Sequence, residues 1–242
     1  GLRIASTEVT SGSGSGAATF SMTGSGSTAN APAGATIAIK ILGTAQTVAS
    51  KAVGFFTPPA TWTSAADANL SLTYPDPRNG DLMVAITAIR PAASTVNTPS
   101  GWTLVDSRTG TDGGAEGADT GSVGIYVFTK TSDGTEGTGT LAFTETGTTS
   151  VWNGNIMKVR SGTGTYSVSG SGYSLNADTV TWGATLGADI GLTNGDLVLL
   201  AAAQNGDLSN TSAWDISGTG VTQKSTFNEH GEFGSTTGND IE

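Results

Sequence analysis

The amino-acid sequence predicts an all-β protein, an antiparallel β-sandwich of jelly-roll-like form. Gly, Thr and Ser supply about two in five of its 242 residues, and Gly and Thr are poor helix formers. Apolar and polar residues alternate over short stretches, the period of a half-buried strand. Turn signals such as Asn-Gly and Asp-Gly separate these stretches. Roughly a dozen short strands joined by turns are typical of a sandwich.

The individual strands follow from these patterns. Strict alternation marks three segments, residues 18–22, 37–41 and 140–144. Segments that are apolar on both faces are expected to be central, namely 82–89, 123–128 and 197–203. Weaker candidates are 48–56, 104–106, 150–159, 166–168, 179–182 and 221–227. Residues 65–70 are the one place where a helical turn is expected. A parallel β-helix is the architectural alternative, but no repeat of roughly 9–30 residues runs along the chain.

A proline pair divides the chain. Pro58-Pro59 cannot lie in a central strand and favours an extended spacer. We therefore expect an N-terminal strand segment over 1–50, a Pro-containing spacer over 51–65 and a sandwich body over 66–242. The first segment holds too few strand candidates for a core of its own. It must pack on the rest of the chain or on another chain.

A short sequence motif occurs twice in the predicted body. Asn79-Gly80-Asp81-Leu82 is matched by Asn194-Gly195-Asp196-Leu197, and each is followed about twenty residues later by a tryptophan, Trp102 and Trp214. One interpretation is convergent turn-plus-strand chemistry, in which Asp accepts a turn hydrogen bond. The other is that two sheets are built alike, with Trp102 and Trp214 filling the core beside an entering strand.

The order of short motifs over residues 79–242 resembles a known module. These motifs are the two Asn-Gly-Asp-Leu strands with Pro99–Leu104, Tyr126–Lys130, Leu141–Thr144 and Trp152–Gly154 between them. The order is similar to that of a β-sandwich module of bacteriophage virion and tail proteins and of large bacterial surface proteins. The resemblance implies a structural or adhesive module with no catalytic residues.

The sequence departs from that family at its closing strands. Pieces similar to them occur at the start of this chain, in Gly14–Phe20 and Ala35–Lys40. The apolar positions of these N-terminal strands are therefore the predicted assembly residues, namely Ala18, Phe20, Met22, Ile37, Ile39 and Ile41. They complete the sandwich of their own chain, as in a circular permutation, or that of a neighbouring chain by strand donation. A third alternative is that they complete no sandwich, and all three alternatives are open at this point.

Charge and composition exclude several classes of function. The formal net charge is −10, with ten basic residues against twenty acidic ones and no basic cluster, so nucleic acid is not an expected partner. No apolar run is long enough for a membrane-spanning helix, so no membrane insertion is expected. Cysteine is absent, which removes disulfides, thiolate metal sites and thiol nucleophiles.

Candidate catalytic and metal-binding residues are sparse. His230 is the single histidine, flanked by Glu229 and Glu232, and both a zinc site and a Ser-His-Asp triad would depend on it. The acidic residues lie mostly in Gly-rich turns, where they serve backbone hydrogen bonding. The loop with Asp112, Glu116 and Asp119 is the one Ca²⁺ candidate, although EF-hand spacing is absent. We expect no enzyme activity and no cofactor.

The sequence therefore predicts a non-catalytic structural subunit of an extracellular or virion assembly. Phage tail, fibre, decoration and surface filament are the candidate settings. Copies of the chain are the expected partners, joined by burial of β-edges, together with other virion or surface proteins. The alternative is a carbohydrate-binding or adhesive module, for which Trp62, Trp152 and Trp182 would form a sugar-stacking face. A core or interface role is the favoured interpretation of these three residues, because a sandwich this rich in glycine needs bulky fillers.

Overall fold

The computed structural model describes the molecule at two levels. Backbone and side chains are described for residues 69–90, 94–109, 123–147 and 152–160, and for Leu199, Ala201 and Ala203. The backbone alone is described for the remaining strand residues, namely 2–9, 18–23, 34–43, 56–57, 63–66, 151, 166–176, 181–186, the rest of 197–204, 221–223 and 230–231.

Every regular element among these residues is a strand. In chain order the strands are β1 Leu2–Val9, β2 Ala18–Thr23, β3 Gly34–Gly43, β4 Phe56–Thr57, β5 Thr63–Ala66, β6 Asn69–Thr73, β7 Leu82–Arg90, β8 Thr95–Val96, β9 Thr103–Thr109, β10 Gly124–Thr131, β11 Thr140–Thr146, β12 Val151–Val159, β13 Tyr166–Asn176, β14 Thr181–Leu186, β15 Leu197–Gln204, β16 Val221–Gln223 and β17 His230–Gly231.

The helical turn predicted over 65–70 is wrong. The ends of this segment lie in β5 and β6. Leu70 and Leu72 alternate along β6 and are both buried, while Asn69 and Ser71 are exposed. The two-residue period therefore determines the local structure, because it lets one face of β6 enter the core.

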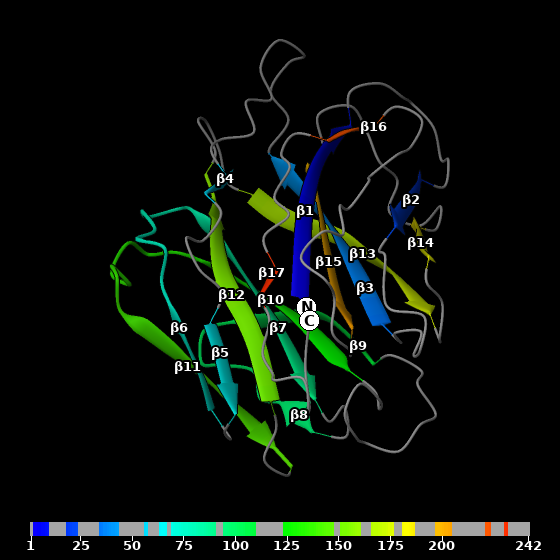
Figure 1. Ribbon diagram of the computed structural model, residues 1–242. Helices are drawn as coiled ribbons and strands as arrows, with labels where there is room; N and C mark the ends of the chain where they lie inside the picture. The colour runs from blue at the N-terminus through cyan, green and yellow to red at the C-terminus, as the bar shows by residue number, and fades with distance from the viewer. Residues whose placement is uncertain are drawn as a thin grey trace.

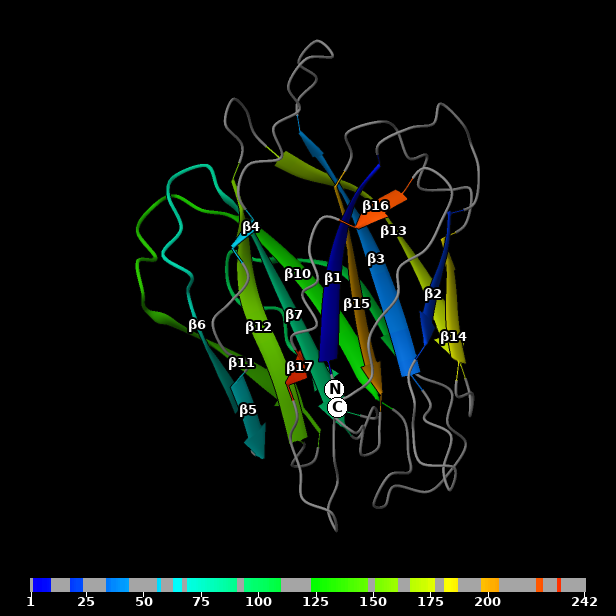
Figure 2. The same ribbon diagram turned by 45° about the horizontal axis from the view of Figure 1, so that its top comes forward.

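The strands form antiparallel sheets (Figures 1 and 2). The central sheet has the order β4-β12-β7-β10-β9, with β5 also paired to β12. A second sheet, which we call the interleaved sheet, has the order β13-β3-β15-β1-β16, with β17 also paired to β1. Strands β6-β11-β8 form a three-stranded sheet, and β14-β2 form a two-stranded one.

Strand β7 is buried along its whole length, from Leu82 to Arg90. Successive side chains of a strand point to opposite faces, so both faces of the central sheet are covered at this strand. One face contacts the three-stranded sheet. On the other side, β3 and β15 approach β10. This double coverage explains why the sequence of β7 is apolar without alternation.

A cluster of aromatic and aliphatic side chains lies between the central sheet and the three-stranded sheet. It comprises Leu70, Leu72, Met83, Ala85, Ile89, Val96, Trp102, Tyr126, Phe128, Phe143, Trp152 and Ile156. Phe143 contacts the Trp102 ring edge-on at 6.4 Å and the Phe128 ring at 5.3 Å between centroids. These spacings are in the favourable range for aromatic pairs, so Phe143 joins β11 to β10 and to the residue that precedes β9.

Gly154 allows β6 to approach β12 closely. A Cβ atom built at this position would lie 2.8 Å from Leu70 Cδ2 and 3.1 Å from the Ile86 carbonyl oxygen. Both distances are shorter than ordinary van der Waals contacts between such atoms. The glycine of the Trp-Asn-Gly motif is therefore required by packing.

The first Asn-Gly-Asp motif is a turn that leads into β7. Gly80 has φ of 86°, and the Asp81 amide donates to the Arg78 carbonyl at 3.0 Å. The Asp81 carboxylate accepts a hydrogen bond from the Arg78 amide at 2.8 Å, which confirms the predicted turn chemistry. The second motif, over 194–196, lies outside the described residues. The structural equivalence of the two copies stays a prediction.

The predicted fold class is confirmed at the level of an all-β, antiparallel architecture that is consistent with a β-sandwich. The jelly-roll connectivity and the boundaries 1–50, 51–65 and 66–242 stay predictions. Strands β4 and β5, which lie within or at the edge of the predicted spacer, pair with β12.

Candidate assembly site

The N-terminal and C-terminal parts of the chain supply alternate strands of the interleaved sheet (Figure 2). Strand β15 pairs with β3 on one side and with β1 on the other. Strand β3 in turn lies between β15 and β13. Strands β1 and β3 are therefore neighbours of β15 and not of each other, and each depends on the C-terminal part for its backbone hydrogen bonds.

Three of the predicted assembly residues lie in β3. The register places Ile37 opposite Ala201 and Ile39 opposite Leu199, with Ile41 opposite Leu197. Leu199 and Ala201 are buried. Opposite positions of an antiparallel pair lie on the same face of the sheet, so positions 37 and 39 lie on the face of β15 that is buried.

The other three predicted assembly residues lie in β2, which is not part of the interleaved sheet. The register places Ala18 opposite Leu186, Phe20 opposite Ala184 and Met22 opposite Trp182. The structure thus separates the two segments that the sequence pattern grouped together. Strand β2 pairs with β14, whereas β3 pairs with β13 and β15.

The central sheet has an apolar face made by the residues that alternate with the aromatic cluster. Its buried apolar members on β7 and β10 are Leu82, Val84, Ile86, Ala88, Ile125 and Val127. Leu199, Ala201 and Ala203 of β15 are equally buried. This apolar face lies on the side from which β3 and β15 approach β10.

Polar side chains interrupt this face near β12. Asn153, Asn155 and Arg90 are all at most 4% exposed. Asn155 and Arg90 have interaction partners. Within the described part of the chain, the Asn153 amide nitrogen and oxygen have no hydrogen-bond partner, and an unpaired buried amide is unfavourable by about 1–3 kcal/mol. Asn153 is therefore the least satisfied polar group on this face.

An ion pair fixes the turn that begins β7 to the end of β12. Arg160 donates to both Asp81 oxygens, at 2.8 Å from Nε and 2.6 Å from Nη2. Burial raises the pKa of the Asp81 carboxyl, but the bonds from Arg160 and the Arg78 amide outweigh it, so the pKa is below its ordinary value. Such a two-bond contact is strong and directional.

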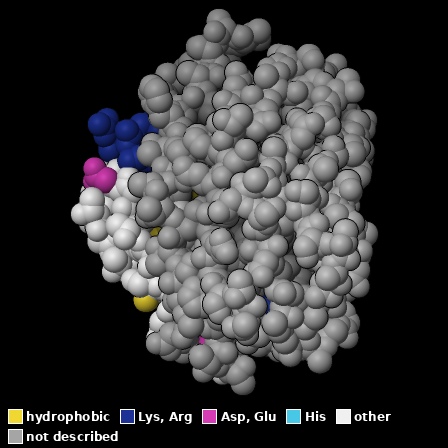
Figure 3. Space-filling view, viewed as in Figure 1, with side chains coloured by type: hydrophobic (Ala, Val, Ile, Leu, Met, Phe, Trp, Pro, Cys, Tyr) yellow, Lys and Arg dark blue, Asp and Glu magenta, His cyan; other side chains and the backbone are white. Residues whose placement is uncertain are grey.

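Lys158 adds a second contact at the same end. Its Nζ donates to the Pro75 carbonyl at 2.6 Å and to the Asp76 carbonyl at 2.9 Å. Figure 3 shows Lys and Arg side chains beside an acidic one at the upper left, the end at which β4 lies in Figure 1. Since the basic groups here bind acidic and carbonyl oxygens, this end is a structural junction.

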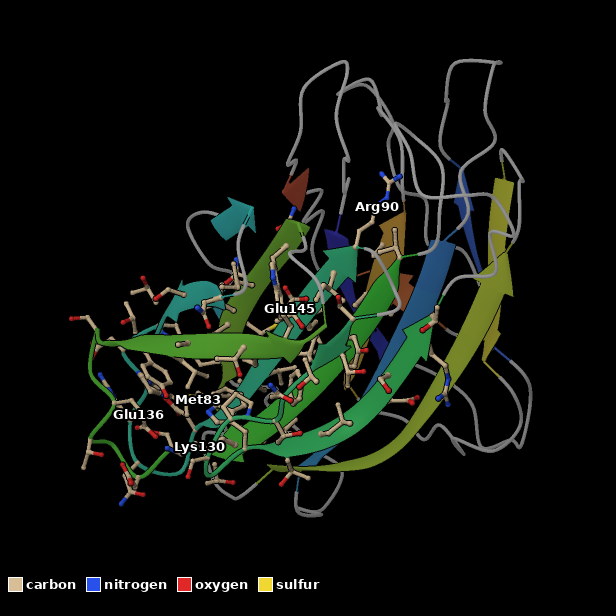
Figure 4. All side chains as sticks on the ribbon, turned by 90° about the horizontal axis from the view of Figure 1, so that it is seen from below. Met83, Arg90, Lys130, Glu136 and Glu145 are labelled. Carbon is tan, nitrogen blue, oxygen red and sulfur yellow. The ribbon has the colours of Figure 1, made fainter. Side chains whose placement is uncertain are left out.

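A third contact, between Lys130 of β10 and Glu136, holds the loop that follows β10. Their side chains lie 2.9 Å apart, and Ser132 Oγ donates to Glu136 at 2.7 Å (Figure 4). Burial raises the pKa of Glu136, but the bonds from Ser132 and Lys130 outweigh it and lower the pKa to about 2. Glu136 is therefore a fixed carboxylate and is unsuited to act as a general acid near neutral pH.

The remaining candidate site residues have the following positions. Trp102 lies in the aromatic cluster. Trp214 and the Ca²⁺ candidates Asp112, Glu116 and Asp119 lie outside the described residues. The His230 backbone lies in β17, opposite Arg3 of β1. Within the described side chains, no three His, Asp or Glu residues gather as a metal site would require.

The core role favoured for the three tryptophans is confirmed for Trp152. Trp152 is fully buried in the aromatic cluster, because its position alternates with Asn153 and points toward the three-stranded sheet. Leu104 is the one exposed large apolar side chain among the described residues. Among the described aromatic side chains, Tyr74 alone is partly exposed, and it packs against the aromatic cluster.

Sequence reasoning missed β1 as an assembly strand and missed the ion pairs. The opening residues Leu2–Ala5 alternate apolar and polar, and this signal could have identified β1. Nothing local indicates the partner of Asp81, because Arg160 is 79 residues away along the chain.

The fold and this site define an all-β protein whose two ends share one sheet. Comparison of the chain with protein-family models, with curated proteins and with solved structures found no match. Among the described residues there is no helix with the length and apolarity needed to cross a membrane.

Proposed function

We propose that this protein is a non-catalytic structural subunit that assembles with copies of itself by completing β-sheets. The observation that carries the proposal is the arrangement of the interleaved sheet, in which β15 pairs on both sides with N-terminal strands. Neither part of the sheet satisfies its backbone hydrogen bonds alone. The same strands can complete the sheet of their own chain or that of a neighbour.

The outer face of the three-stranded sheet is consistent with this role. Its exposed residues are uncharged and small, namely Asn69, Ser71, Thr73, Thr95, Thr140, Ala142, Thr144 and Thr146. Asn97 bonds to the hydroxyls of Thr144 and Thr146 at 3.0 and 3.1 Å. Thr suits the solvent side of a strand, because its β-branched carbon fits the pleated surface and its hydroxyl can bond to water. This face suits the solvent side of a subunit.

An extracellular or virion setting, in a phage tail, fibre, decoration or surface filament, is part of the same proposal. It is supported by the order of motifs over residues 79–242. The net charge of −10 would keep free subunits apart until specific edges align.

The test is the state of association of the purified full chain. Sedimentation velocity from micromolar to millimolar concentration should show a monomer giving way to large species of defined size. Electron microscopy of those species should show regular oligomers, fibres or shells. A protein that stays monomeric at millimolar concentration would refute the proposal.

A further inference from the structure

We infer that the peptide bond between Asp76 and Pro77 is a site of self-cleavage, at which the Asp76 carboxyl group is the nucleophile and Lys158 stabilises the oxyanion. The bond lies in the loop between β6 and β7 and is the single Asp-Pro bond of the sequence. The reaction is one turnover on the chain's own backbone. It therefore goes beyond the proposed structural role and does not depend on self-association.

The backbone of Asp76 has an unfavourable conformation. Its φ is 51°, and it is the one non-glycine residue with a positive φ among those that the structure describes. Asp tolerates this region better than most residues, but a following proline favours an extended backbone with negative φ. Outliers of this kind persist where surrounding contacts impose them, and they gather at functional sites.

Contacts on both sides of the loop impose this conformation. Upstream, the Tyr74 amide donates to the Gly139 carbonyl at 2.8 Å. Downstream, the Gly80 amide donates to the Ser132 carbonyl at 2.9 Å, and the Asp81 carboxylate is held by its ion pair at the end of β12. Because the loop is fixed at both ends, the Asp76–Pro77 bond cannot relax by a shift of the loop as a whole.

Lys158 places a positive charge at the carbonyl group of the bond that breaks. Its Nζ donates to the Asp76 carbonyl oxygen at 2.9 Å, at the end of the molecule where Figure 3 shows basic side chains beside an acidic one. A donor at this distance stabilises the negative charge that forms on the oxygen when its carbon is attacked. Strand β12 pairs with β7 along its whole length, so Lys158 extends from a well-supported strand. Arg160 adds a second positive charge that acts on Asp76.

The Asp76 carboxyl group is suited to attack its own carbonyl carbon. A bond between a side-chain oxygen and that carbon closes a five-membered ring, which needs only a rotation about the Cα–Cβ bond. Asp76 is exposed, so packing does not prevent this rotation. An intramolecular nucleophile of this kind avoids the entropic cost of bringing two reactants together.

Cleavage consumes one water molecule and proceeds in two steps. In the first, an oxygen of the Asp76 carboxylic acid bonds to the Asp76 carbonyl carbon and the carbon–nitrogen bond to Pro77 breaks. The proton of the carboxylic acid passes to the proline nitrogen, which leaves as a secondary amine. In the second step, water opens the cyclic anhydride, and Asp76 becomes a new carboxyl terminus with two carboxyl groups.

The two products should stay together in the folded protein. Strand β6 of the upstream product pairs with β11, and β4 and β5 pair with β12. Strands β7, β11 and β12 all belong to the downstream product. Cleavage therefore opens the loop between β6 and β7 without separating the sheets.

The experiment follows the full chain at pH 5 by intact mass and by sequencing of the new amino terminus. The folded chain is compared with the same chain unfolded in guanidinium at the same pH. We expect the products 1–76 and 77–242, formed at least about tenfold faster in the folded chain. Size-exclusion chromatography without denaturant should show the two products as one species.

Four variants separate the roles of the side chains. D76N removes the nucleophilic carboxyl group and should abolish cleavage. K158M removes the donor and should slow cleavage by about tenfold to a hundredfold, whereas K158R keeps a positive donor and should retain more of the rate. R78Q is the matched control, because Arg78 is exposed in the same loop and binds Asp81 through its backbone amide. It should cleave at the native rate.

Equal rates in the folded and unfolded native chains would show only the ordinary acid lability of an Asp-Pro bond, and would overturn the proposal. A folded chain that stays intact would do the same. If K158M cleaves as fast as R78Q, Lys158 is not the oxyanion donor and the assigned mechanism is wrong. Circular dichroism at pH 5 identifies any variant that does not fold, and D76N against the native chain then decides whether the carboxyl group is the nucleophile.

Discussion

At the scale of single residues, the best-defined contact is the ion pair between Asp81 and Arg160. Asp81 is 3% exposed and accepts three hydrogen bonds, two from Arg160 and one from the Arg78 amide. A buried carboxylate in this state depends on its donors. The contact joins the start of β7 to the end of β12, which pair along their whole length.

Replacing Asp81 should therefore destabilise the fold. We expect D81N to lower the free energy of unfolding by about 2 kcal/mol, since hydrogen bonds to charged groups contribute about 1.5–3 kcal/mol. Urea denaturation at pH 7 measures the change. R78Q is the control, because the Arg78 side chain is exposed and it is the backbone amide that binds Asp81. Equal effects of D81N and R78Q would contradict this account.

Glu136 should make the stability of the protein depend on pH. Its pKa falls from an ordinary value of 4.5 to about 2 in the folded chain. A lowered folded-state pKa contributes stability above the unfolded pKa and loses it as pH falls through the folded value. We expect the contribution to be present above pH 4.5 and to disappear between 4.5 and 2.

The measurement is the urea midpoint at pH 7, 4 and 3 for the native chain and for E136Q. The variant should be less stable at pH 7 and should lose less stability on acidification. Its remaining pH dependence belongs to other carboxylates, including Asp81, whose pKa is also lowered. Parallel curves for the two proteins would show that Glu136 contributes nothing to the pH dependence.

At the scale of elements, the sequence predicts strands better than it predicts their neighbours. The segments predicted as central, 82–89 and 197–203, differ by one residue from β7 and β15. Their apolar runs and Asn-Gly turns are local signals. The position of β15 between β1 and β3 depends on residues nearly 200 positions away, and the two-residue period carries no information about it.

The sequence pattern likewise could not predict which sheet each candidate assembly strand would join. Ile37, Ile39 and Ile41 were identified by alternation and lie in a strand that joins the two chain ends. Ala18, Phe20 and Met22 alternate equally well, yet β2 pairs with β14 alone. Pattern identifies a strand with one apolar face, and the packing of the complete chain selects its sheet.

Substitution of Gly154 directly tests the close packing of β6 against β12. We expect G154A to lower the free energy of unfolding by about 1–3 kcal/mol, because its methyl group would overlap Leu70 and the Ile86 carbonyl. Thermal unfolding followed by circular dichroism measures the shift. S71A is the control, since Ser71 is on the same strand as Leu70 but is exposed. An unchanged melting temperature for G154A would show that β6 and β12 separate without penalty.

At the scale of the whole molecule, the interleaved sheet makes the chain ends one cooperative unit. Strands β1 and β3 precede the strands of the central sheet in sequence, while β13, β15 and β16 follow them. Any event that removes β3 exposes edges on both β13 and β15. The central and three-stranded sheets have their own aromatic cluster. They should therefore retain structure when the interleaved sheet opens, as separate units of local stability do.

Hydrogen exchange can separate these two units. We expect I39P to abolish amide protection in β13 and β15, because proline removes a donor in a strand that is paired on both sides. Peptides from β7 and β10 should stay protected, since they pair with each other and not with β3. I39V is the control, as it keeps the backbone amide. If I39P leaves β15 as protected as I39V does, the N-terminal strands are not what completes this sheet, and the proposed mode of assembly loses its basis.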